Sequence, residues 1–282
     1  MLVLEMGMRG PGEIARLCAV GRPDVGIVTA VAAAHTGRLG GIDGVAAAKG
    51  ELVEALPTGG TAILNADDPR VLAMAERTAA DVLTFGLAPM ADVRVEDLRL
   101  DEWARPTFVA RTPWGTAQVA LIVSGAHMAM NAAAALAAAG VVGVAIDDAS
   151  VALRSAELAA RRMQLRPAAG GGAVVDDAYN ANPASVGAAL DALAAIGAER
   201  RIAVLGLMAE LDDPPTEHGR IAAHAKRLGV QLIAVETDLY GVEPIARDAV
   251  AARLGPITAG TAVLVKGSLV AGLGPVADAL VR

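Results

Sequence analysis

Short apolar runs alternate with longer segments whose apolar residues recur at helical spacing over the first part of the chain. The runs end at Gly, Pro or Asp, as buried strands of a sheet commonly do. This alternation predicts a parallel α/β sheet with crossover helices. The expected strands are residues 2–7, 25–31, 61–66 and 81–86, and the expected helices are residues 11–20, 44–56 and 68–79.

Residues 91–124 follow a different pattern, in which apolar and polar side chains alternate. They contain the turn signal Pro113-Trp114-Gly115, so a small antiparallel patch is expected there. Residues 127–160 are rich in alanine, and the pattern predicts that they are helical.

A second alternation of strands and helices begins after the glycine run Gly170–Gly172. No Lys-Ser or Lys-Thr follows that run, so we expect a hairpin tip there in place of a phosphate loop. The change of pattern predicts two α/β domains with a boundary near residue 160. The expected strands contain GAVVDDA, RIAVLGLM, QLIAVE and TAVLVKGS, and the expected helices contain SVGAALDALAAIG, EHGRIAAHAKRLG and LVAGLGPVADALV.

The composition supports two domains and argues against two classes of partner. A chain of 282 residues, of which 54% are hydrophobic, can bury two cores. Its formal net charge is −7 and its basic residues form no block, so no nucleic-acid partner is expected. No apolar run reaches the length of a membrane span, and MLVLEMGMRG lacks the features of a signal peptide, so no membrane association is expected.

Cys18 is the only cysteine of the chain. A single thiol excludes an internal disulfide and a zinc site built on several thiolates, and it fits a reducing cytoplasm. Because Cys18 lies in an expected helix, we interpret it as a small buried hydrophobic residue.

Polar residues follow many of the predicted strands. In open α/β sheets, ligands collect beyond the carboxyl ends of the strands, so these residues predict a site with contributions from several strands. They are Glu5, His35 and Asn65 with Asp67 and Asp68 in the first half, and Asp176 to Asn180, Gly206 to Glu210 and Lys266 to Ser268 in the second.

Each of these residues also has a purely structural interpretation, which the sequence leaves open. Glu5 could be a surface acid, and His35 could be hydrogen-bonded at a loop boundary. Lys49 is typical of a solvated helix residue, and Lys266 could extend its amine to the surface. Asp68 with Pro69 is a good start for a helix and needs no further function.

Several motifs occur in a fixed order from the first residues of the chain to the last. They are LEMG with PGEIA, AAAHTGRLGGIDGVAAAKGE, AILNADDP, GAHMAMNAAAALAA, RRMQ, VVDDAYNANPAS, VLGLMAELDD with EHGRIA, and VLVKGSLVAGL. Together they resemble the Mur ligase family. VVDDAYNANP and LVKGS are the most specific of them, and they resemble the dipeptide-adding member more than its siblings.

The resemblance implies an ATP-dependent amide ligase that adds D-alanyl-D-alanine to UDP-N-acetylmuramoyl-tripeptide in peptidoglycan synthesis. A substrate carboxylate would become an acyl phosphate, which the dipeptide amine then attacks. Residues 1–160 are then a partial central ATP-binding domain with an ATPase-type parallel sheet. Residues 161–282 are a Rossmann-like C-terminal α/β domain that binds the dipeptide and part of ATP. The implied cofactors are ATP and Mg²⁺, and a cytoplasmic monomer is expected.

The resemblance also implies a magnesium site in the first domain. Glu5 and His35 are the expected ligands, because a hard cation prefers oxygen and tolerates one imidazole. Lys49 is expected to be carbamylated, which turns a cation into a carboxylate that helps to hold a second Mg²⁺. Carbamylation needs a neutral amine, and hence local desolvation or neighbouring positive charge.

The nucleotide is expected to contact both domains. Asn131 resembles the amide that binds the adenine edge, and Asp176 or Asp177 is expected to hold the ribose. Arg162 resembles the arginine that contacts the terminal phosphate of ATP, where it would offset charge during phosphoryl transfer.

The remaining implied residues surround the nucleotide and the incoming dipeptide. Tyr179, Asn180 and Asn182 are expected to shape the cleft for nucleotide and acceptor. Lys266 and Ser268 are expected to help position the dipeptide. The implied catalytic residues are therefore Lys49, His35, Arg162 and Lys266.

One family motif has no counterpart here, because no G-x-x-x-x-G-K-S/T phosphate loop occurs in the chain. The family places that loop in the central domain, before the strand that holds Glu5. We therefore expect the chain to represent the later part of a ligase and to be poorly active by itself. Two alternatives stay open: a noncatalytic remnant that binds nucleotide or dipeptide, and a sibling ligase such as a folylpolyglutamate synthase.

Overall fold

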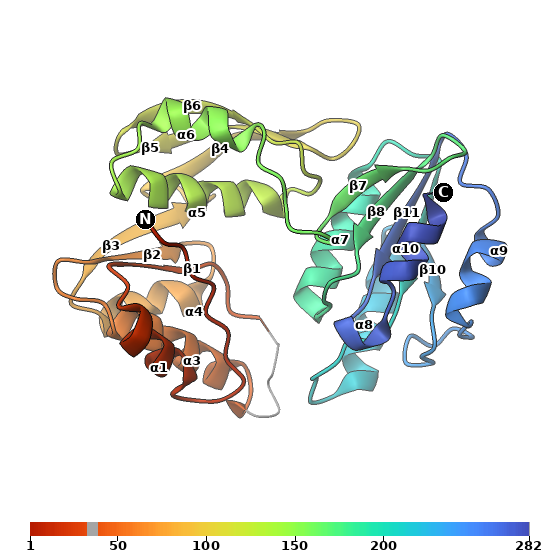
Figure 1. Ribbon diagram of the computed structural model, residues 1–282, viewed down its shortest axis with the longest axis horizontal. Helices are drawn as coiled ribbons and strands as arrows, with labels where there is room; N and C mark the ends of the chain where they lie inside the picture. Colours follow the sequence, from red (N-terminus) through yellow and green to blue (C-terminus); the bar gives the residue numbers. More distant parts are fainter. Residues whose placement is uncertain (33–38, 282) are drawn as a thin grey trace. The chain divides into compact units, whose positions relative to one another are not determined.

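The computed structural model describes residues 1–32 and 39–281, which form two compact α/β units, each with its own sheet (Figure 1). The first unit contains residues 1–98, 107–120 and 129–155. The second contains residues 99–106, 121–128 and 156–282.

The sheet of the first unit has the strand order β1-β2-β3-β4-β5-β6. Its strands are β1 (Val25–Val28), β2 (Thr61–Asn65), β3 (Asp81–Gly86), β4 (Val93–Leu100), β5 (Pro106–Thr112) and β6 (Gly115–Ala120). The pairs from β1 to β4 are parallel, whereas β5 and β6 form an antiparallel hairpin. The expected parallel sheet and its antiparallel patch are both confirmed.

The helices of this unit, in chain order, are α1 (Glu13–Gly21), α3 (Ile42–Glu54), α4 (Pro69–Leu72) and the 3₁₀ helix η1 (Ala73–Arg77), followed by α5 (His127–Val141) and α6 (Ile146–Leu153). Helices α1 and α3 pack on the parallel part of the sheet, and α6 packs on strand β6 of the antiparallel hairpin. Val28 and Leu64 of the sheet share one apolar core with Ile14 and Val45 of α1 and α3. Cys18 belongs to the same core and is 3% exposed, as expected for a small hydrophobic residue.

The β5–β6 hairpin turns at Pro113 and Trp114, as its turn signal predicts. Thr112 Oγ1 accepts a hydrogen bond from Trp114 N at 3.1 Å and donates one to Gly115 O at 2.9 Å. The Trp114 ring lies against α5 at Gly140, where an added Cβ would be 2.2 Å from the ring. A glycine is therefore required at residue 140 for this close contact.

Two expectations for the first unit are corrected by the structure. Residues 2–7 form no strand, because an extended segment becomes a strand only when it pairs with a neighbour and these residues join neither sheet. Residues 68–79 form the short α4 followed by η1 instead of one helix. Asp68 is the N-cap of α4 and accepts from Arg70 N and Val71 N, as its structural interpretation predicts.

The sheet of the second unit has the order β10-β9-β11-β8-β7. Its strands are β7 (Gln164–Pro167), β8 (Ala173–Asp177), β9 (Arg200–Leu205), β10 (Gln231–Ala234) and β11 (Thr261–Lys266). All pairs are parallel except β7 with β8. Gly171 (φ 88°) lies in the tight β7–β8 turn, so the glycine run is the expected hairpin tip.

Helices lie on both faces of the second sheet, which confirms a Rossmann-like α/β arrangement (Figure 1). The α-helices are α7 (Pro183–Ala195), α8 (Pro214–Arg227), α9 (Val250–Leu254) and α10 (Gly274–Leu280), with 3₁₀ turns η2 (Arg247–Ala249) and η3 (Leu269–Ala271). One apolar core joins Val174 and Val263 of the sheet to Leu254 and Val276 of α9 and α10. Helices α7 and α8 pack on the opposite face, against β9, β10 and β11.

No helix within the described ranges has both the length and the apolar character that crossing a bilayer requires.

Candidate functional site

The carboxyl ends of β8, β11 and β9 lie side by side in the second unit. Lys266, the last residue of β11, is paired with Asp177 of β8 on one side and with Leu205 of β9 on the other. Residues that are far apart in the sequence therefore meet at one edge of the sheet, where ligands of open α/β sheets collect.

Lys266 is buried at this edge, with only 3% of its surface exposed. Its Nζ donates to Asp177 Oδ2 at 2.5 Å and to the carbonyl of Asn180 at 2.8 Å. Burial lowers the pKa of Lys266, and the Asp177 carboxylate acts in the opposite direction. The alternative that Lys266 extends its amine to the surface is wrong.

Asp177 connects a third segment to this charge pair. Its Oδ1 accepts from Met163 N at 3.0 Å, while its Oδ2 receives the Lys266 amine. A buried pair of this kind is tolerated because each charge has a partner and further hydrogen bonds. The pair therefore joins β8, β11 and the residue 163 segment.

Ser268 braces two loops at the same edge. Its Oγ donates to the carbonyl of Ala181 at 3.2 Å and accepts from Ala209 N at 2.8 Å. Its backbone N–H donates to Leu207 O at 2.9 Å. Lys266 and Ser268 thus hold the backbone of Asn180 and Ala181, and with it the loop between β8 and α7.

Tyr179 and Arg162 form an exposed cationic platform beside this loop. The Arg162 guanidinium carbon lies 4.3 Å from the centroid of the Tyr179 ring. Tyr179 is 45% exposed and Arg162 is also exposed. A guanidinium stacked on an aromatic ring keeps its donors in a fixed plane, which suits the recognition of a phosphate or carboxylate.

Asn180 and Asn182 have different environments. Asn180 is exposed, and its Oδ1 accepts from Ala181 N at 2.9 Å. Asn182 is the N-cap of α7, where its Oδ1 accepts a hydrogen bond from Ser185 N. In return, Ser185 Oγ accepts a hydrogen bond from Asn182 N, which completes a capping box. The side-chain oxygen of Asn182 is therefore engaged in starting the helix.

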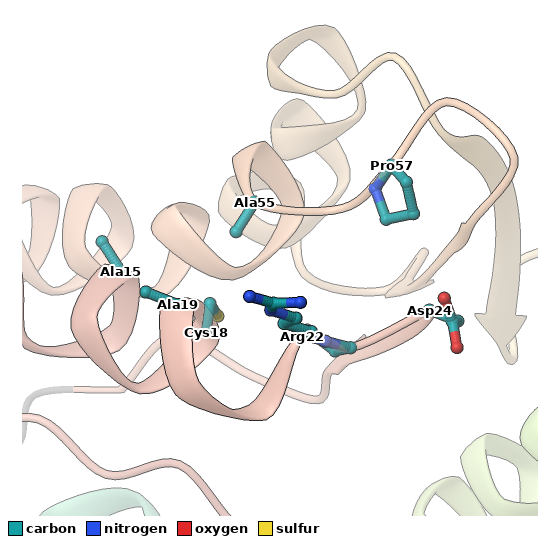
Figure 2. Close-up of a pocket in the computed structure, with 8 residues that line it drawn as sticks. Ala15, Cys18, Ala19, Arg22, Asp24, Ala55 and Pro57 are labelled. Atoms are coloured by element: carbon teal, nitrogen blue, oxygen red, sulfur yellow. The ribbon is translucent and has the colours of Figure 1, made fainter.

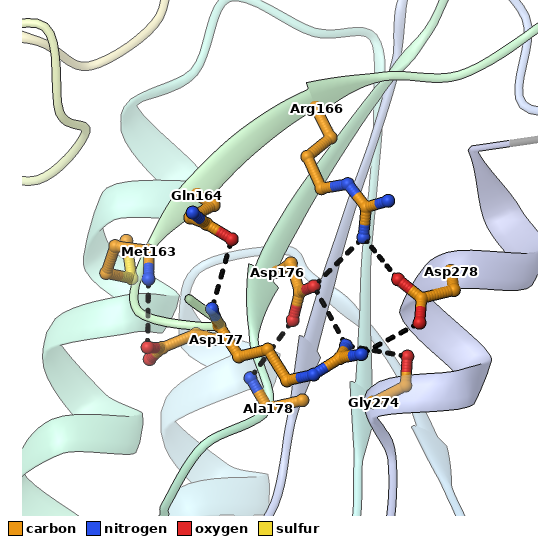
Figure 3. Close-up of polar contacts among 9 residues, drawn as sticks. Met163, Gln164, Arg166, Asp176, Asp177, Ala178, Gly274 and Asp278 are labelled. Carbon is orange, nitrogen blue, oxygen red and sulfur yellow. Dashed lines mark hydrogen bonds and ion pairs between the residues drawn. The ribbon is translucent and has the colours of Figure 1, made fainter. Parts of the chain in front are cut away.

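Asp176 points into an ion-pair network (Figure 3). It is 1% exposed, and its Oδ2 accepts from Arg161 at 3.2 Å and from Arg166 at 3.1 Å. Its Oδ1 accepts from Ala178 N at 3.3 Å. The two adjacent acids at the end of β8 therefore have different partners, because Asp176 binds arginines and Asp177 binds Lys266.

His127 is a residue of this region that sequence reasoning missed. Burial lowers its pKa, and the charges of Asp177 and Lys266 both act on it. Gly125 permits this placement, since an added Cβ there would lie 2.5 Å from His127 Cε1. The Gly-x-His sequence at the start of α5 could have drawn attention to it.

Asn131, the expected adenine contact, lies exposed on α5.

In the first unit, the amine of Lys49, a residue of α3, reaches the segment that follows the carboxyl end of β1. Its Nζ donates to Ala30 O at 2.7 Å, and burial lowers its pKa whereas the nearby Asp68 acts to raise it. Asn65, at the end of β2, donates from Nδ2 to Thr29 O at 2.7 Å. Lys49 is therefore partly desolvated, unlike an ordinary solvated helix lysine.

The expected magnesium ligands are only partly described. Glu5 is exposed and lies outside any strand, so the prediction that it ends a strand is wrong. His35 lies outside the described residues. Within residues 1–32 and 39–281, no three His, Cys, Asp or Glu side chains gather closely enough to hold a metal ion. Lys49 fits a hard cation only as a carbamate, whose oxygens replace the amine, and its partly buried amine is compatible with that modification.

A shallow pocket of about 460 Å³ lies elsewhere in the first unit (Figure 2). Arg22 and Cys18 line it, with Asp24 just before β1 and Pro57 before β2. It therefore lies at the amino ends of the strands, opposite the carboxyl ends where Lys49 and Asn65 lie. None of the expected site residues lines it.

Sequence profiles of known domains match most of the chain. The Mur ligase middle domain matches residues 1–139, and the Mur ligase, glutamate ligase domain matches residues 161–269. The chain is 40% identical, over an alignment of 317 residues, to the UDP-N-acetylmuramoyl-tripeptide--D-alanyl-D-alanine ligase of Mycobacterium bovis. The alignment covers 99% of this chain and 62% of that relative.

Solved structures give the same relationship. A crystal structure of MurF from Acinetobacter baumannii matches 99% of this chain and 64% of its own, with a TM-score of 0.89 and 26% identity. The MurF ligase of Thermotoga maritima, in complex with ADP, matches 98% of this chain and 66% of its own, with a TM-score of 0.87. At 24% identity, this second likeness shows the fold alone.

Proposed function

This chain belongs to the Mur ligase family, and from that premise we propose that it serves ATP-dependent ligation of D-alanyl-D-alanine to UDP-N-acetylmuramoyl-tripeptide. The product would be a precursor of peptidoglycan, made in the cytoplasm by a monomeric protein for the growth, shape and division of the cell wall. Residues 1–160 would be the ATP-binding central domain, and residues 161–282 the domain that binds the dipeptide.

The observation that carries the proposal is the exposed Arg162 guanidinium on Tyr179, next to the buried Lys266–Asp177 pair. An exposed, oriented cation is suited to a phosphoryl group, because it offsets the charge that develops during transfer. The adjoining β8–α7 loop, which Lys266 and Ser268 hold in place, would form the surface for the dipeptide.

The other residues would act on the nucleotide and the metal. Asn131 would bind the adenine edge and Asp177 or Asp176 the ribose. Asn180, Asn182 and Tyr179 would line the same surface. Their roles follow from the family resemblance, and their positions near the carboxyl end of β8 and on α5 are compatible with it.

Magnesium would be held by Glu5, His35 and a carbamylated Lys49. When bound, the ion would supply positive charge that polarises the phosphoryl oxygens. The lowered pKa of Lys49 supports its part, because only a neutral amine reacts with carbon dioxide. The carbamate would then present oxygen ligands to the cation.

A second candidate function is binding without turnover, in a chain that has no phosphate-loop sequence. The loop held by Lys266 and Ser268, and the Arg162 guanidinium on Tyr179, would suit a nucleotide- or dipeptide-binding protein equally well. A sibling ligase with another acceptor, such as a folylpolyglutamate synthase, would share the chemistry. The VVDDAYNANP and LVKGS motifs favour the dipeptide-adding member.

The proposal is tested by NMR titration of the ¹⁵N-labelled chain with D-alanyl-D-alanine, with L-alanyl-L-alanine as the control ligand. We expect shifts of the Asn180, Ala181 and Ser268 amides with the D-dipeptide only. Equal shifts with both dipeptides, or none with either, would contradict the assignment of the acceptor. ADP release that depends on both substrates, at whatever rate, would exclude binding without turnover.

A further inference from the structure

Arg162 lies between two residues with unusual backbone conformations. Arg161 has φ 61° and Met163 has φ 47°, both in the left-handed region that residues other than glycine seldom adopt. Such conformations are strained, and they persist only where the surrounding structure holds them. The 161–163 turn must therefore be restrained by other groups.

Hydrogen bonds to the backbone groups of the turn supply the first set of restraints. Arg161 N donates to Gln164 Oε1 at 3.0 Å, and Met163 N donates to Asp177 Oδ1 at 3.0 Å. Tyr179 N donates to Arg161 O at 3.1 Å. The same turn is thus tied to Tyr179, on whose ring the Arg162 guanidinium lies.

Four charged side chains supply the second set, and we call them the ion-pair clamp (Figure 3). Arg161 donates to Asp176 at 3.2 Å and to Asp278 at 2.8 Å. Arg166 donates to the same two carboxylates, at 3.1 and 2.8 Å. The ion-pair clamp therefore connects the 161–163 turn to β7, β8 and α10.

Gly274 admits the Arg161 guanidinium to α10. Arg161 donates to Gly274 O at 2.8 Å, and an added Cβ at Gly274 would lie 2.6 Å from Arg161 Cζ. Asp176 is 1% exposed, so its negative charge requires the two guanidinium groups that it accepts from. The Arg162 guanidinium lies over the Tyr179 ring.

We propose that the ion-pair clamp of Arg161, Arg166, Asp176 and Asp278 maintains the left-handed 161–163 turn and thereby positions the Arg162 guanidinium on Tyr179 to receive an anionic phosphoryl group. Asp278 and Gly274 are positioning residues: they do not contact the ligand and would affect its binding only by orienting Arg162. The identity of the ligand as a nucleotide rests on the proposed function, whereas the positioning of Arg162 does not.

The positioning is tested by NMR on the full chain in two variants. Asp278→Asn removes one charge of the ion-pair clamp, and Gly274→Ala retains every charge but displaces the Arg161 guanidinium. The ring current of Tyr179 shifts the Arg162 Hδ and Nε resonances, which Arg162→Lys and Tyr179→Leu identify. We expect both variants to lose most of that ring-current shift.

Matched controls separate the clamp from general effects of substitution. Asp248→Asn removes an exposed acid of the same unit, and Gly219→Ala adds a methyl group to α8 at a position with open space. Both controls are expected to retain the Arg162 shift. The conservative variant Asp278→Glu is expected to restore much of it.

A purely structural clamp would give a different result. In that case Asp278→Asn and Gly274→Ala would lower the unfolding temperature while the Arg162 shift stayed at its wild-type value, and the proposal would be overturned. Should Asp278→Asn fail to fold, Gly274→Ala decides the question, because it removes no charge.

A binding measurement adds the functional consequence. Calorimetric titration of the chain with Mg-ADP is expected to show about fivefold weaker binding in Asp278→Asn, with Asp248→Asn within twofold of wild type. Unchanged affinity together with a lost Arg162 shift would overturn the functional half of the proposal. A wild-type chain that binds no ADP would contradict the proposed function, and the NMR result alone would then decide the positioning of Arg162.

Discussion

At the scale of single residues, neighbouring acids at one strand end have separate tasks. Asp177 pairs with the buried Lys266 amine, while Asp176 pairs with Arg161 and Arg166. Successive side chains of a strand point to opposite faces, so adjacent residues meet different neighbours. The pairing also makes Lys266 a structural support of the β8–α7 loop in addition to any contact with a ligand.

Removing the Lys266 charge is expected to destabilise the second unit strongly. Lys266→Met leaves Asp177 buried beside an apolar group, which costs about 3–5 kcal/mol. Urea unfolding, followed by NMR signals of the second unit, measures the loss. Adding Asp177→Leu is expected to recover much of it, and the exposed control Lys226→Met should change stability by less than about 0.5 kcal/mol. A loss of less than about 1 kcal/mol in the free energy of unfolding of Lys266→Met would contradict the role of Lys266 as the partner of buried Asp177.

Lys49 is expected to form a carbamate. Burial lowers the pKa of its amine, which makes a neutral fraction available for reaction, and the amine donates to Ala30 O. The ¹³C NMR spectrum of the chain in ¹³C-bicarbonate should show a carbamate resonance that Lys49→Met removes and Lys226→Met retains. A spectrum without that resonance, or one that persists in Lys49→Met, would refute the assignment.

At the scale of elements, helix α8 supports the loop that follows β9. The ring of His218, which is fully buried, accepts from Met208 N through Nε2 at 3.0 Å, and its Nδ1 donates to Pro214 O at 2.7 Å. Tyr240 packs edge-on against the ring and donates from its hydroxyl to Gly206 O at 2.8 Å. This arrangement requires neutral His218, because a second N–H would oppose the Met208 amide.

The stability of the second unit is therefore expected to depend on pH through His218. Burial lowers its pKa, and the weaker influences of Pro214 O and Glu217 act to raise it. The unfolded chain then binds a proton that the folded chain rejects. The His218 contribution is complete above the unfolded pKa of about 6.5 and is lost as the pH falls below it.

Urea unfolding at about pH 7.5 and about pH 5.5 measures this dependence. Wild type should lose stability on acidification, and His218→Gln should lose less. His127, whose pKa is also lowered by burial, is expected to contribute the remaining dependence. An identical loss in His218→Gln and wild type would contradict the role of His218.

At the scale of the whole molecule, the two units share an α/β architecture but differ in the polar residues beyond their strand ends. Each has parallel strands with polar groups beyond their carboxyl ends: Asn65 of β2 and the amine of Lys49 from α3 in the first unit, and Asp177 and Lys266 in the second. The chain spans 62% of the length of the Mycobacterium bovis ligase that it resembles. The activity of the whole ligase is therefore a proposal for this chain.

The 282-residue chain is expected to have little or no ligase activity by itself. It contains no phosphate-loop sequence, whose amides and lysine stabilise the transferred phosphoryl group, and each loss of about 1.4 kcal/mol slows the reaction tenfold. ADP release in the presence of the muramoyl-tripeptide and D-alanyl-D-alanine measures this activity. A rate that depends on the dipeptide and matches that of a full-length family ligase would show the expectation to be wrong.

Much of the fold could be predicted because the decisive signals are local. The alternation of apolar runs with helical patterns, the Pro113-Trp114-Gly115 turn, the Gly170–Gly172 tip and the Asp68 cap each depend on a few consecutive residues. Residues 2–7 form no strand, because an apolar run shows only that a strand is favourable, whereas a strand also needs a neighbour to pair with. Strand β7 was not foreseen, since its four residues carry little pattern of their own.

The sequence by itself determined the α/β class, the order of the elements and the polar residues at the strand ends, because backbone preference and side-chain periodicity are properties of short segments. Only the tertiary structure decided that Lys266 is buried, that Asp176 and Asp177 bind different cations, and that Arg161 and Arg166 meet Asp278 from the last helix. Burial and charge pairing depend on neighbours more than 80 residues away in the chain for both Lys266 with Asp177 and Arg161 with Asp278. Such partners become visible only when the sheet brings its strand ends together.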